Sequence, residues 1–304
     1  MNNQVVVNQV LILFFIIALG FIARKKNVLS STATKDLTSL LMNVTCPFTI
    51  FTSFRLEYSR AALFGAGQVL AFAVGFHLFA LLLGLVIFNR QPEAVKRVLR
   101  FTTTFSNCGF MGFPLLQSVY GKNGIFYASF YVMVFNLFLW TVGIRLFSGK
   151  REEASWQKVL ANPNLIAVGL GLISFLLPAK LPDPVYAAME IVGAMNTPLS
   201  MLLVGATLTE VQAGQLFAGW PVYYGSIVRL LIMPFIALIT TGLLNFPPLL
   251  QGVCVLSAAT PAAALTTSFA AKYDGDTRLS SRMILLSTLF SVVTLPFFAF
   301  LVNR

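Results

Sequence analysis

Long apolar stretches separated by short polar segments dominate the chain, and each stretch has about the length of a membrane-spanning helix. A helix needs roughly 20 apolar residues to cross the hydrocarbon core of a bilayer. The pattern predicts ten such spans, at residues 5–23, 37–54, 61–88, 98–120, 124–147, 158–177, 185–208, 218–244, 249–270 and 279–302. We therefore expect an all-α polytopic membrane protein embedded in a lipid bilayer.

Composition supports a membrane location. Of the 304 residues, 57% are hydrophobic and only 10% are charged, whereas soluble domains carry about 25% charged residues. The first apolar stretch has its basic residues, Arg24-Lys25-Lys26, after it and none before it. A cleavable signal peptide shows the reverse order. We expect this stretch to be a retained span whose amino end lies outside.

The basic residues are distributed unequally between the two sides that successive spans define. Fifteen of the 21 Lys and Arg residues follow odd-numbered spans, five follow even-numbered spans, and Arg229 lies inside the eighth span. The positive-inside rule then places residues 148–157 in the cytoplasm and both termini outside. The net charge of +11 reflects this topology, so we expect no nucleic-acid partner.

The polar segment 148–157 divides the ten spans into five plus five. An odd number of spans in each half gives the halves opposite orientations, which predicts an inverted repeat. Pro47 matches Pro198 at an offset of 151 residues, and Pro114 matches Pro261 at an offset of 147. The two predicted repeats are residues 1–150 and 158–304.

Motifs of enzymes, cofactor sites and metal sites are missing from the chain. It has one histidine and no HExxH, Walker or GxSxG motif. Its three cysteines, Cys46, Cys108 and Cys254, lie in apolar segments without metal-ligand spacing. We therefore expect no enzymatic activity, no cofactor and no bound metal.

The segment SNCGFMGFPLL, residues 106–116, combines an asparagine, two glycines and a proline inside the fourth span. Proline in a helix interior costs about 3 kcal/mol. Non-helical backbone survives at membrane depth only where protein or a water-filled cavity covers it. The pattern predicts either a break in the helix between Asn107 and Pro114 or a simple proline kink with glycines for close packing.

The segment SAATPAAALTTS, residues 257–268, predicts a second break, in the ninth span. Thr260 followed by Pro261 is typical of a helix start, with a hydroxyl N-cap and proline at the first helical position. If both breaks lie at the midplane and cross, two helix N-termini point at one spot. Such an arrangement favours an anion.

The pattern N-x-G-x-x-G-x-P, formed by Asn107, Gly109, Gly112 and Pro114, belongs to a wider resemblance. Together with TPAAALTTSFAAKYDGD, STLFSVVTLP and NTPLSMLLVGATL, it resembles the auxin efflux carrier family of membrane transporters over essentially the whole chain. In that family, asparagine stands at the ninth-span break, where this chain has Thr260. The long cytoplasmic loop of some plant members is also missing.

The resemblance implies the fold of bile-acid symporters and sodium/proton antiporters. Spans 1, 2, 6 and 7 (residues 5–54 and 158–208) would form a scaffold, which is also an expected homodimer interface. Spans 3–5 and 8–10 (residues 61–147 and 218–302) would form a moving core with crossed, broken helices four and nine. Bacterial members are associated with malate, malonate and related carboxylates, which implies a location in the bacterial inner membrane.

Several intramembrane polar residues have two interpretations each. Arg229, about twelve residues into its span, binds a substrate carboxylate or tethers backbone carbonyls. Asn136 faces the crossing or makes an interhelical hydrogen bond. His77 relays protons or is simply hydrogen-bonded. The residues expected to bind substrate are Asn43, Asn107, Gly109, Gly112, Pro114, Asn136, Asn196, Arg229, Thr260 and Pro261.

We therefore expect a secondary transporter of small organic anions that works by an elevator-like movement. A dicarboxylate such as malate or malonate is favoured, because its two negative ends suit two helix N-termini and Arg229. Intramembrane carboxylates that resemble a sodium cage are missing, so any coupling ion is expected to be a proton. Asp274 and Asp276 are expected to cap a loop. The alternatives are a sodium-coupled symporter of bile-acid type and a membrane sensor that binds the ligand without carrying it.

Overall fold

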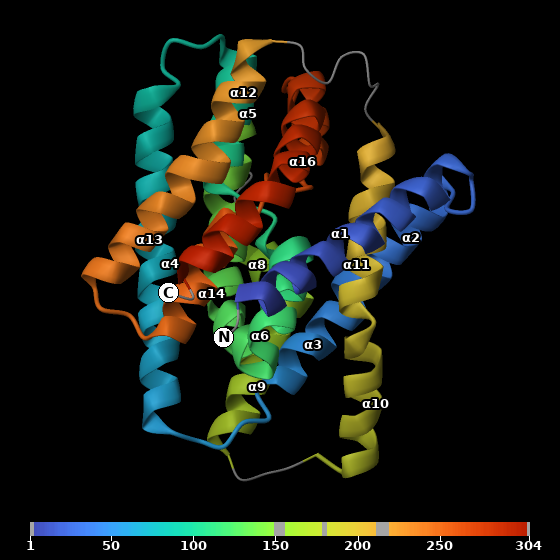
Figure 1. The fold of residues 1–304 in the computed structure, drawn as a ribbon, viewed down its shortest axis with the longest axis vertical. Coiled ribbons are helices and arrows are strands. Elements are labelled where there is room, and N and C mark those ends of the chain that lie inside the picture. Colours follow the sequence, from blue (N-terminus) through green and yellow to red (C-terminus); the bar gives the residue numbers. More distant parts are fainter. Residues whose placement is uncertain (1–2, 149–155, 178–180, 211–218, 303–304) are drawn as a thin grey trace.

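The computed structural model describes residues 3–148, 156–177, 181–210 and 219–302, and these residues form helices and no β-strand (Figure 1). The helices are α1 (Asn3–Lys25), α2 (Ser31–Leu40), α3 (Cys46–Ser53), α4 (Arg60–Ile87), α5 (Glu93–Thr104), α6 (Phe113–Phe138), α7 (Ile144–Ser148), α8 (Trp156–Leu160), α9 (Pro163–Leu176), α10 (Asp183–Ala194), α11 (Asn196–Thr207), α12 (Trp220–Ile227), α13 (Met233–Leu243), α14 (Pro248–Ala259), α15 (Thr266–Lys272) and α16 (Thr277–Val302). Shorter wide or tight helical turns are η1 (Leu41–Thr45), η2 (Cys108–Gly112), η3 (Leu139–Gly143), η5 (Leu208–Glu210) and η7 (Val228–Ile232).

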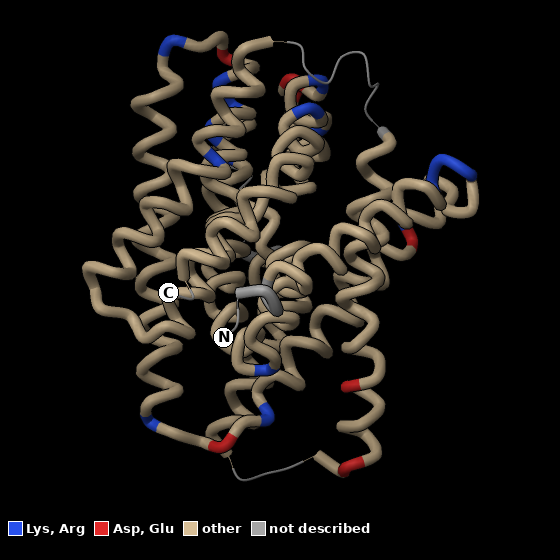
Figure 2. Tube along the Cα trace, in the orientation of Figure 1, with Lys and Arg blue, Asp and Glu red and all other residues tan. Residues whose placement is uncertain are grey.

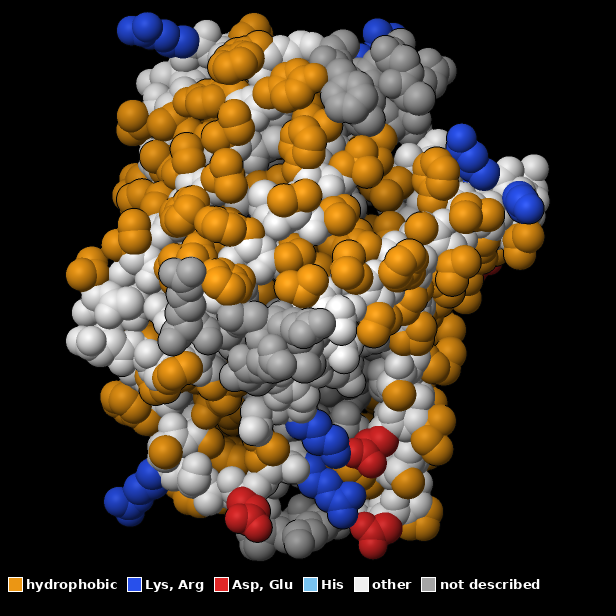
Figure 3. All heavy atoms as spheres, in the orientation of Figure 1, with side chains coloured by type: hydrophobic (Ala, Val, Ile, Leu, Met, Phe, Trp, Pro, Cys, Tyr) orange, Lys and Arg blue, Asp and Glu red, His pale blue; other side chains and the backbone are white. Residues whose placement is uncertain are grey.

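Charged residues gather toward the ends of the molecule, and the middle of the chain trace is nearly free of them (Figure 2). Apolar side chains cover the middle of the visible face (Figure 3). Within the described residues, six helical runs are long and apolar enough to cross a membrane. They are Val7–Lys25, Arg60–Ile87, Cys108–Ser148, Asp183–Thr207, Trp220–Leu243 and Thr277–Val302. The chain is therefore an all-helical, multi-pass membrane protein.

The prediction of ten spans is confirmed only as far as these six long apolar runs. Two shorter apolar helices, α9 and α14, add to the six long runs. The run Cys108–Ser148 is also interrupted at Gly121, where the backbone is not helical (φ +59°, ψ −144°). Helix α6 therefore consists of two helices joined at that residue. The connector predicted at 148–157 lies mostly outside the described residues. The count of ten and the five-plus-five repeat stay predictions.

Three prolines widen their helices and do not break them. Pro47, Pro114 and Pro234 each stand two residues after a π-helical segment, η1, η2 and η7 respectively. Proline has no N–H to donate and its ring collides with the carbonyl four residues earlier, so the preceding turn expands.

The break predicted between Asn107 and Pro114 lies earlier in the chain than expected. The non-helical residues are 105–107, and the helix has already restarted at Cys108.

The helices pack in two groups that lie side by side. In one group, α1 runs along α11, and α3 packs between α9, in the lower centre of Figure 1, and α10, on the right. In the other group, α4 packs on α5 and α6, while α14 contacts α6, α13 and α16. The two groups meet where α1 contacts α16 and where α11 contacts α6 and η2.

The seam between α1 and α11 depends on two glycines that bring the backbones together. A methyl group on Gly20 would collide with the Leu202 carbonyl oxygen, and one on Gly205 would collide with the Ile17 carbonyl oxygen. Neither position has room for a side chain. Small residues at helix interfaces are the usual means of close approach in membranes, where burial from water does not drive association.

We predict that Gly205→Ala lowers the melting temperature of the purified protein in detergent, because the added methyl group forces α1 and α11 apart. Overpacking of this kind costs about 1–3 kcal/mol. Gly75→Ala, in α4, is the matched control, since an added methyl group there meets nothing within 4 Å. The control should keep or slightly raise the melting temperature. Equal melting temperatures for the two variants would contradict the close packing of α1 against α11 at Gly205.

Candidate functional site

Two helices break and cross at the centre of the fold. α5 ends at Thr104 and α14 ends at Ala259, and the chain that follows each helix is extended. Ser106 and Ala262 form an antiparallel bridge between the two extended segments. The Asn107 N–H donates to the Pro261 carbonyl at 2.7 Å, and the Ala263 N–H donates to the Phe105 carbonyl at 3.1 Å. Each break therefore satisfies backbone groups of the other.

The breaks leave several carbonyls near the end of each helix without their normal donors, among them those of Thr103 and Ala258. In an unbroken helix, the Asn107 N–H would donate to Thr103, and the Ala262 N–H would donate to Ala258. Instead the Asn107 N–H bonds across the crossing, and the Ala262 N–H donates to Ser287 Oγ at 3.1 Å. The carbonyls of Thr103 and Ala258 need other partners, because an unsatisfied buried polar group costs about 1–3 kcal/mol.

Arg229 supplies both missing donors from η7, and its side chain is fully buried. Its Nη1 donates to the Thr103 carbonyl at 2.9 Å, and its Nη2 donates to the Ala258 carbonyl. A cation beside the negative ends of two helices is also electrostatically favourable. Of the two interpretations of Arg229, the structure shows the contacts of the tether. Its Nε is buried without a partner, and a role in substrate binding is a separate question that these contacts leave untested.

The prediction that Thr260 and Pro261 start a helix is wrong. Thr260 ends α14, and the following helix, α15, starts at Thr266. The Thr260 hydroxyl does not accept from the next turn; it donates back to the Ser257 carbonyl at 2.9 Å. That carbonyl lost its helical donor because Pro261 has no N–H. The threonine-proline pair therefore terminates a helix here.

Asn107 stands at the crossing with its carboxamide unused. It directly precedes η2, it is 4% exposed, and among the described residues its side chain has no hydrogen-bond partner. A methyl group on Gly109 would meet nothing within 4 Å, so there is space beside the first turn of η2. Gly112 is tighter, since a methyl group there would lie 3.6 Å from Thr260 Cγ2. Pro114 is buried in the next turn.

The other predicted residues lie in different surroundings. Asn136 donates to the Val132 carbonyl at 2.9 Å and accepts from Asn162 at 3.1 Å, which is the interhelical alternative. Asn43 is exposed and bonds to Ser39 in its own helix.

His77 and Asn196 are both buried. The Nδ1 of His77 lies 2.7 Å from the Ala73 carbonyl, and its ring packs among five aromatic rings, which is the simple hydrogen-bonded interpretation. Asn196, the first residue of α11, has a buried Nδ2 without a partner. None of these contacts tests the predicted binding role of Asn196 or the proton relay through His77.

A cavity of about 350 Å³ opens beside the crossing, between the two packing groups. Its walls come from α2 and α11 on one side and from η2, α15 and α16 on the other. Its lining is rich in hydroxyl groups, contains Lys35, and includes no acidic residue among the described side chains. The polar lining residues are Thr34, Lys35, Thr38, Thr207, Thr267, Ser268 and Ser281.

None of the residues that line this cavity belongs to the set of binding residues predicted from the sequence. The segment STATKDLTSL, which forms α2, lies mainly before the second apolar stretch, where hydropathy predicts a connector. The signal that could have found it is a high density of hydroxyl residues within a helix-forming segment. Phe110 also lines the cavity and follows Asn107 by three residues, so the cavity borders the first turn of η2.

Polar contacts also join the two packing groups away from this cavity. Lys122, just after the Gly121 turn, pairs with Glu190 of α10. The Thr197 hydroxyl of α11 donates to the Gln117 side chain of α6 at 2.9 Å. The Glu190 side chain is 38% exposed, so this ion pair is partly in contact with solvent. Asp276 accepts from the Leu279 N–H at 2.8 Å and caps α16, as predicted.

We predict that Arg229→Lys lowers the melting temperature of the ligand-free protein, because a single ammonium group does not reproduce the two-carbonyl contact of a guanidinium fork. One carbonyl left without a donor costs about 1–3 kcal/mol. Arg278→Lys, at an exposed position of α16, is the control and should leave the melting temperature unchanged. Wild-type stability of the Arg229→Lys variant would exclude the tether as the main role of Arg229.

Comparisons with known proteins agree with this architecture. The family model described as membrane transport protein matches residues 5–299. An uncharacterized transporter of Methanothermobacter thermautotrophicus is 29% identical over 94% of this chain and 95% of its own length. For an uncharacterized transporter of Methanocaldococcus jannaschii the identity is 27%, over 94% and 95%. The uncharacterized transporter YfdV of Escherichia coli K12 is 23% identical over 95% of both chains. Because the family model spans nearly the whole chain, this protein belongs to the membrane transport protein family, the auxin efflux carrier family that its motifs resemble.

Proposed function

We propose that the protein is a secondary transporter of small organic anions, with a dicarboxylate such as malate or malonate as the favoured substrate. The observation that carries the proposal is the cavity beside the crossing. It is lined by Lys35 and hydroxyl groups, and none of its described lining residues is acidic. At about 350 Å³ it has the size of a small-molecule site. A cation and neutral donors without a carboxylate suit a carboxylate ligand.

The donors at the crossing extend this argument. The first N–H groups of η2 have no partner within their own helix and carry the positive end of its dipole. The Asn107 carboxamide and the Asn196 Nδ2 add unused side-chain donors. Gly109 leaves space for a ligand to approach this backbone. We propose that one carboxylate binds at this end of the cavity.

Lys35 replaces Arg229 as the second positive group in this proposal. Both Nη atoms of Arg229 are engaged by helix carbonyls, whereas Lys35 is exposed at the cavity wall. A ligand with two carboxylates would place one at the start of η2 and the other toward Lys35. A monocarboxylate would use only one of these two groups.

The structure also supports the proposed ten-span repeat and moving core. The first halves of the two broken helices, α5 and α14, have 12 residues each, and Arg229 contacts the second-last residue of both. This correspondence is what two repeats of the same structural unit would show. The two packing groups fit the expected scaffold and core. Lys122–Glu190 and Gln117–Thr197 would be contacts that form in one position of the core and part in the other.

The proposal includes a bacterial inner-membrane location with both termini outside, an optional proton linkage and a homodimer through the scaffold. The alternatives are a sodium-coupled symporter and a ligand sensor that does not transport.

We predict that proteoliposomes containing the purified protein accumulate radiolabelled malate or malonate faster than protein-free liposomes, and faster than they accumulate a monocarboxylate of similar size. Uptake should be independent of sodium. Accumulation that requires sodium would support the symporter. Saturable binding without uptake would support the sensor, and neither binding nor uptake of any carboxylate would refute the proposal.

The variant Lys35→Gln tests the role of the cavity in the same uptake assay. Because Lys35 is exposed, its charge is worth about 0.2–1 kcal/mol, which corresponds to an increase in KM of about 1.4- to fivefold. Lys26→Gln removes the same charge from an exposed position outside the cavity lining and is the matched control. The same KM in both variants would argue against Lys35 as a substrate contact.

We predict that Asn107→Ala raises the KM for the carboxylate by about tenfold or more while the melting temperature stays unchanged. A hydrogen bond to a charged group is worth about 1.5–3 kcal/mol, and the Asn107 side chain has no protein partner to lose among the described residues. Asn136→Ala is the matched comparison, because that side chain has two protein partners. It should lower the melting temperature with little effect on KM, and the reverse pattern would place the substrate near Asn136.

A further inference from the structure

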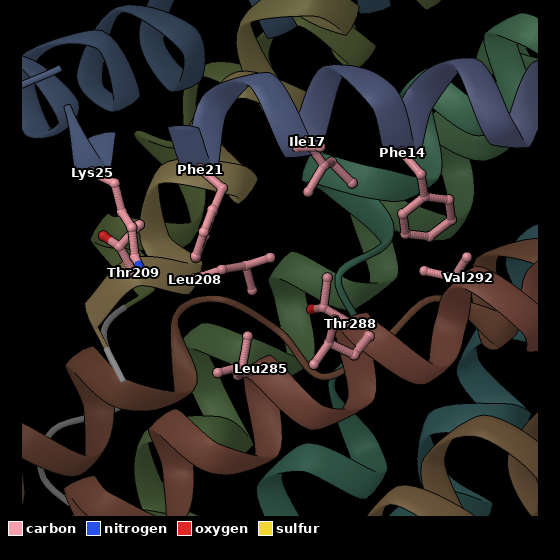
Figure 4. Close-up of a pocket in the computed structure, with 11 residues that line it drawn as sticks. Phe14, Ile17, Phe21, Lys25, Leu208, Thr209, Leu285, Thr288 and Val292 are labelled. Atoms are coloured by element: carbon pink, nitrogen blue, oxygen red, sulfur yellow. The ribbon is translucent and has the colours of Figure 1, made fainter. Parts of the chain in front are cut away.

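A second cavity, of about 480 Å³, lies between α1 and α16 (Figure 4). Side chains of α1 and α16 point toward each other across it, and Leu208 and Thr209 of η5 close one side. Lys25 and Thr209 lie at one end, whereas Phe14 and Val292 lie at the other. The lining between the ends is almost wholly apolar. We call this cavity the α1–α16 groove.

The groove is open to the surroundings of the protein along its rim. Leu289 is 43% exposed and Ala18 is also exposed, although both line the cavity. Its length follows from α1, because the 11 helical steps from Phe14 to Lys25 rise roughly 16 Å. This length is close to half of the roughly 30 Å hydrocarbon core of a bilayer. The groove therefore has the length of one leaflet.

The charged end of the groove has the chemistry of a phosphate site. Lys25 is exposed, lies 5.1 Å from the centre of the Phe21 ring, and has no carboxylate partner among the described residues. It belongs to the basic run that ends α1 and that marks the cytoplasmic surface by the positive-inside rule. Anionic lipids are the principal negative groups at that surface.

We propose that the α1–α16 groove is a binding site for an anionic phospholipid of the cytoplasmic leaflet. One acyl chain would lie along the apolar lining from Leu208 toward Phe14 and Val292, and the phosphate would lie beside Lys25. An apolar channel one leaflet long with a cation at its membrane-surface end fits this amphiphile. A free phosphate would leave the apolar lining empty, and a zwitterionic lipid would bring a cationic group to the Lys25 end of the groove together with its phosphate.

The site joins the two packing groups, because α1 belongs to the proposed scaffold and α16 to the proposed core. A bound lipid would then move or be released when the core moves. This consequence rests on the proposed function, but lipid binding itself does not, and it is measured without transport.

Native mass spectrometry of the delipidated full-length protein, titrated with phosphatidylglycerol or phosphatidylcholine, tests the proposal. The wild type should bind phosphatidylglycerol more tightly. Lys25→Gln should weaken phosphatidylglycerol binding about fivefold, which corresponds to about 1 kcal/mol, and weaken phosphatidylcholine binding less, because the choline cation offsets the charge of its phosphate. Lys26→Gln, outside the lining, should have little effect on either lipid. Equal binding of the two lipids, or equal effects of the two lysine variants, would overturn the proposal.

A second pair of variants tests the groove itself. Ala18→Trp fills the cavity from an exposed position and should remove the tight lipid from the spectrum. Leu19→Trp adds similar bulk on the neighbouring residue, which is 59% exposed and outside the lining, and should keep it. Loss of the lipid in both variants, or in neither, would show that the lipid does not bind in the groove.

Discussion

The central constraint on this fold is that a helix broken inside a membrane must satisfy every backbone group that the break releases. Lipid offers no hydrogen bonds, so each orphaned group costs several kcal/mol. The chain meets this constraint by breaking two helices at one place. The extended segments around Ser106 and Ala262 exchange hydrogen bonds, and Arg229 donates to one released carbonyl at the end of each helix. Neither break would be stable in lipid without the other.

The hydrogen bonding at the two breaks is asymmetric, because carbonyl groups find donors within the protein and amide donors are left free. This asymmetry determines what the site can bind. At the carbonyl ends of α5 and α14, one carbonyl of each helix accepts from the buried Arg229 guanidinium. At the amide end, the helix that restarts at Cys108 follows an asparagine whose carboxamide has no described partner, beside a glycine with open space. A site with its acceptors satisfied and its donors free favours an acceptor ligand. The proposed anion would then bind without Arg229 as its partner.

Sequence patterns predict the elements that depend on local residues. They fail where contacts with distant parts of the chain determine the position of an element or the partners of a side chain. The break near Asn107 follows from residues that disfavour a helix in lipid, but its exact position depends on pairing with a segment far along the chain. Thr260-Pro261 resembles a helix start because this dipeptide can stand at either end of a helix. The hydrogen bond from the Thr260 hydroxyl to the Ser257 carbonyl identifies it here as a helix end. Hydropathy locates Arg229 but not its partners. It misses the cavity because Lys35 and the hydroxyls of α2 lie outside the most apolar segments.

The two kinds of contact in the fold differ in how easily they can be remade. The α1–α11 seam, with backbones in direct contact at Gly20 and Gly205, tolerates no sliding, because side chains on either helix would collide with the facing carbonyls. Between the groups, Lys122–Glu190 is a partly exposed ion pair of the kind worth about 0.2–1 kcal/mol, and Gln117–Thr197 is a single neutral hydrogen bond. Such contacts part at little cost, and water or other side chains replace them. In the proposed movement of the core, these polar contacts would part while the α1–α11 seam stays closed, and the apolar contacts between the groups, such as Phe54 against Phe126, would slide past one another.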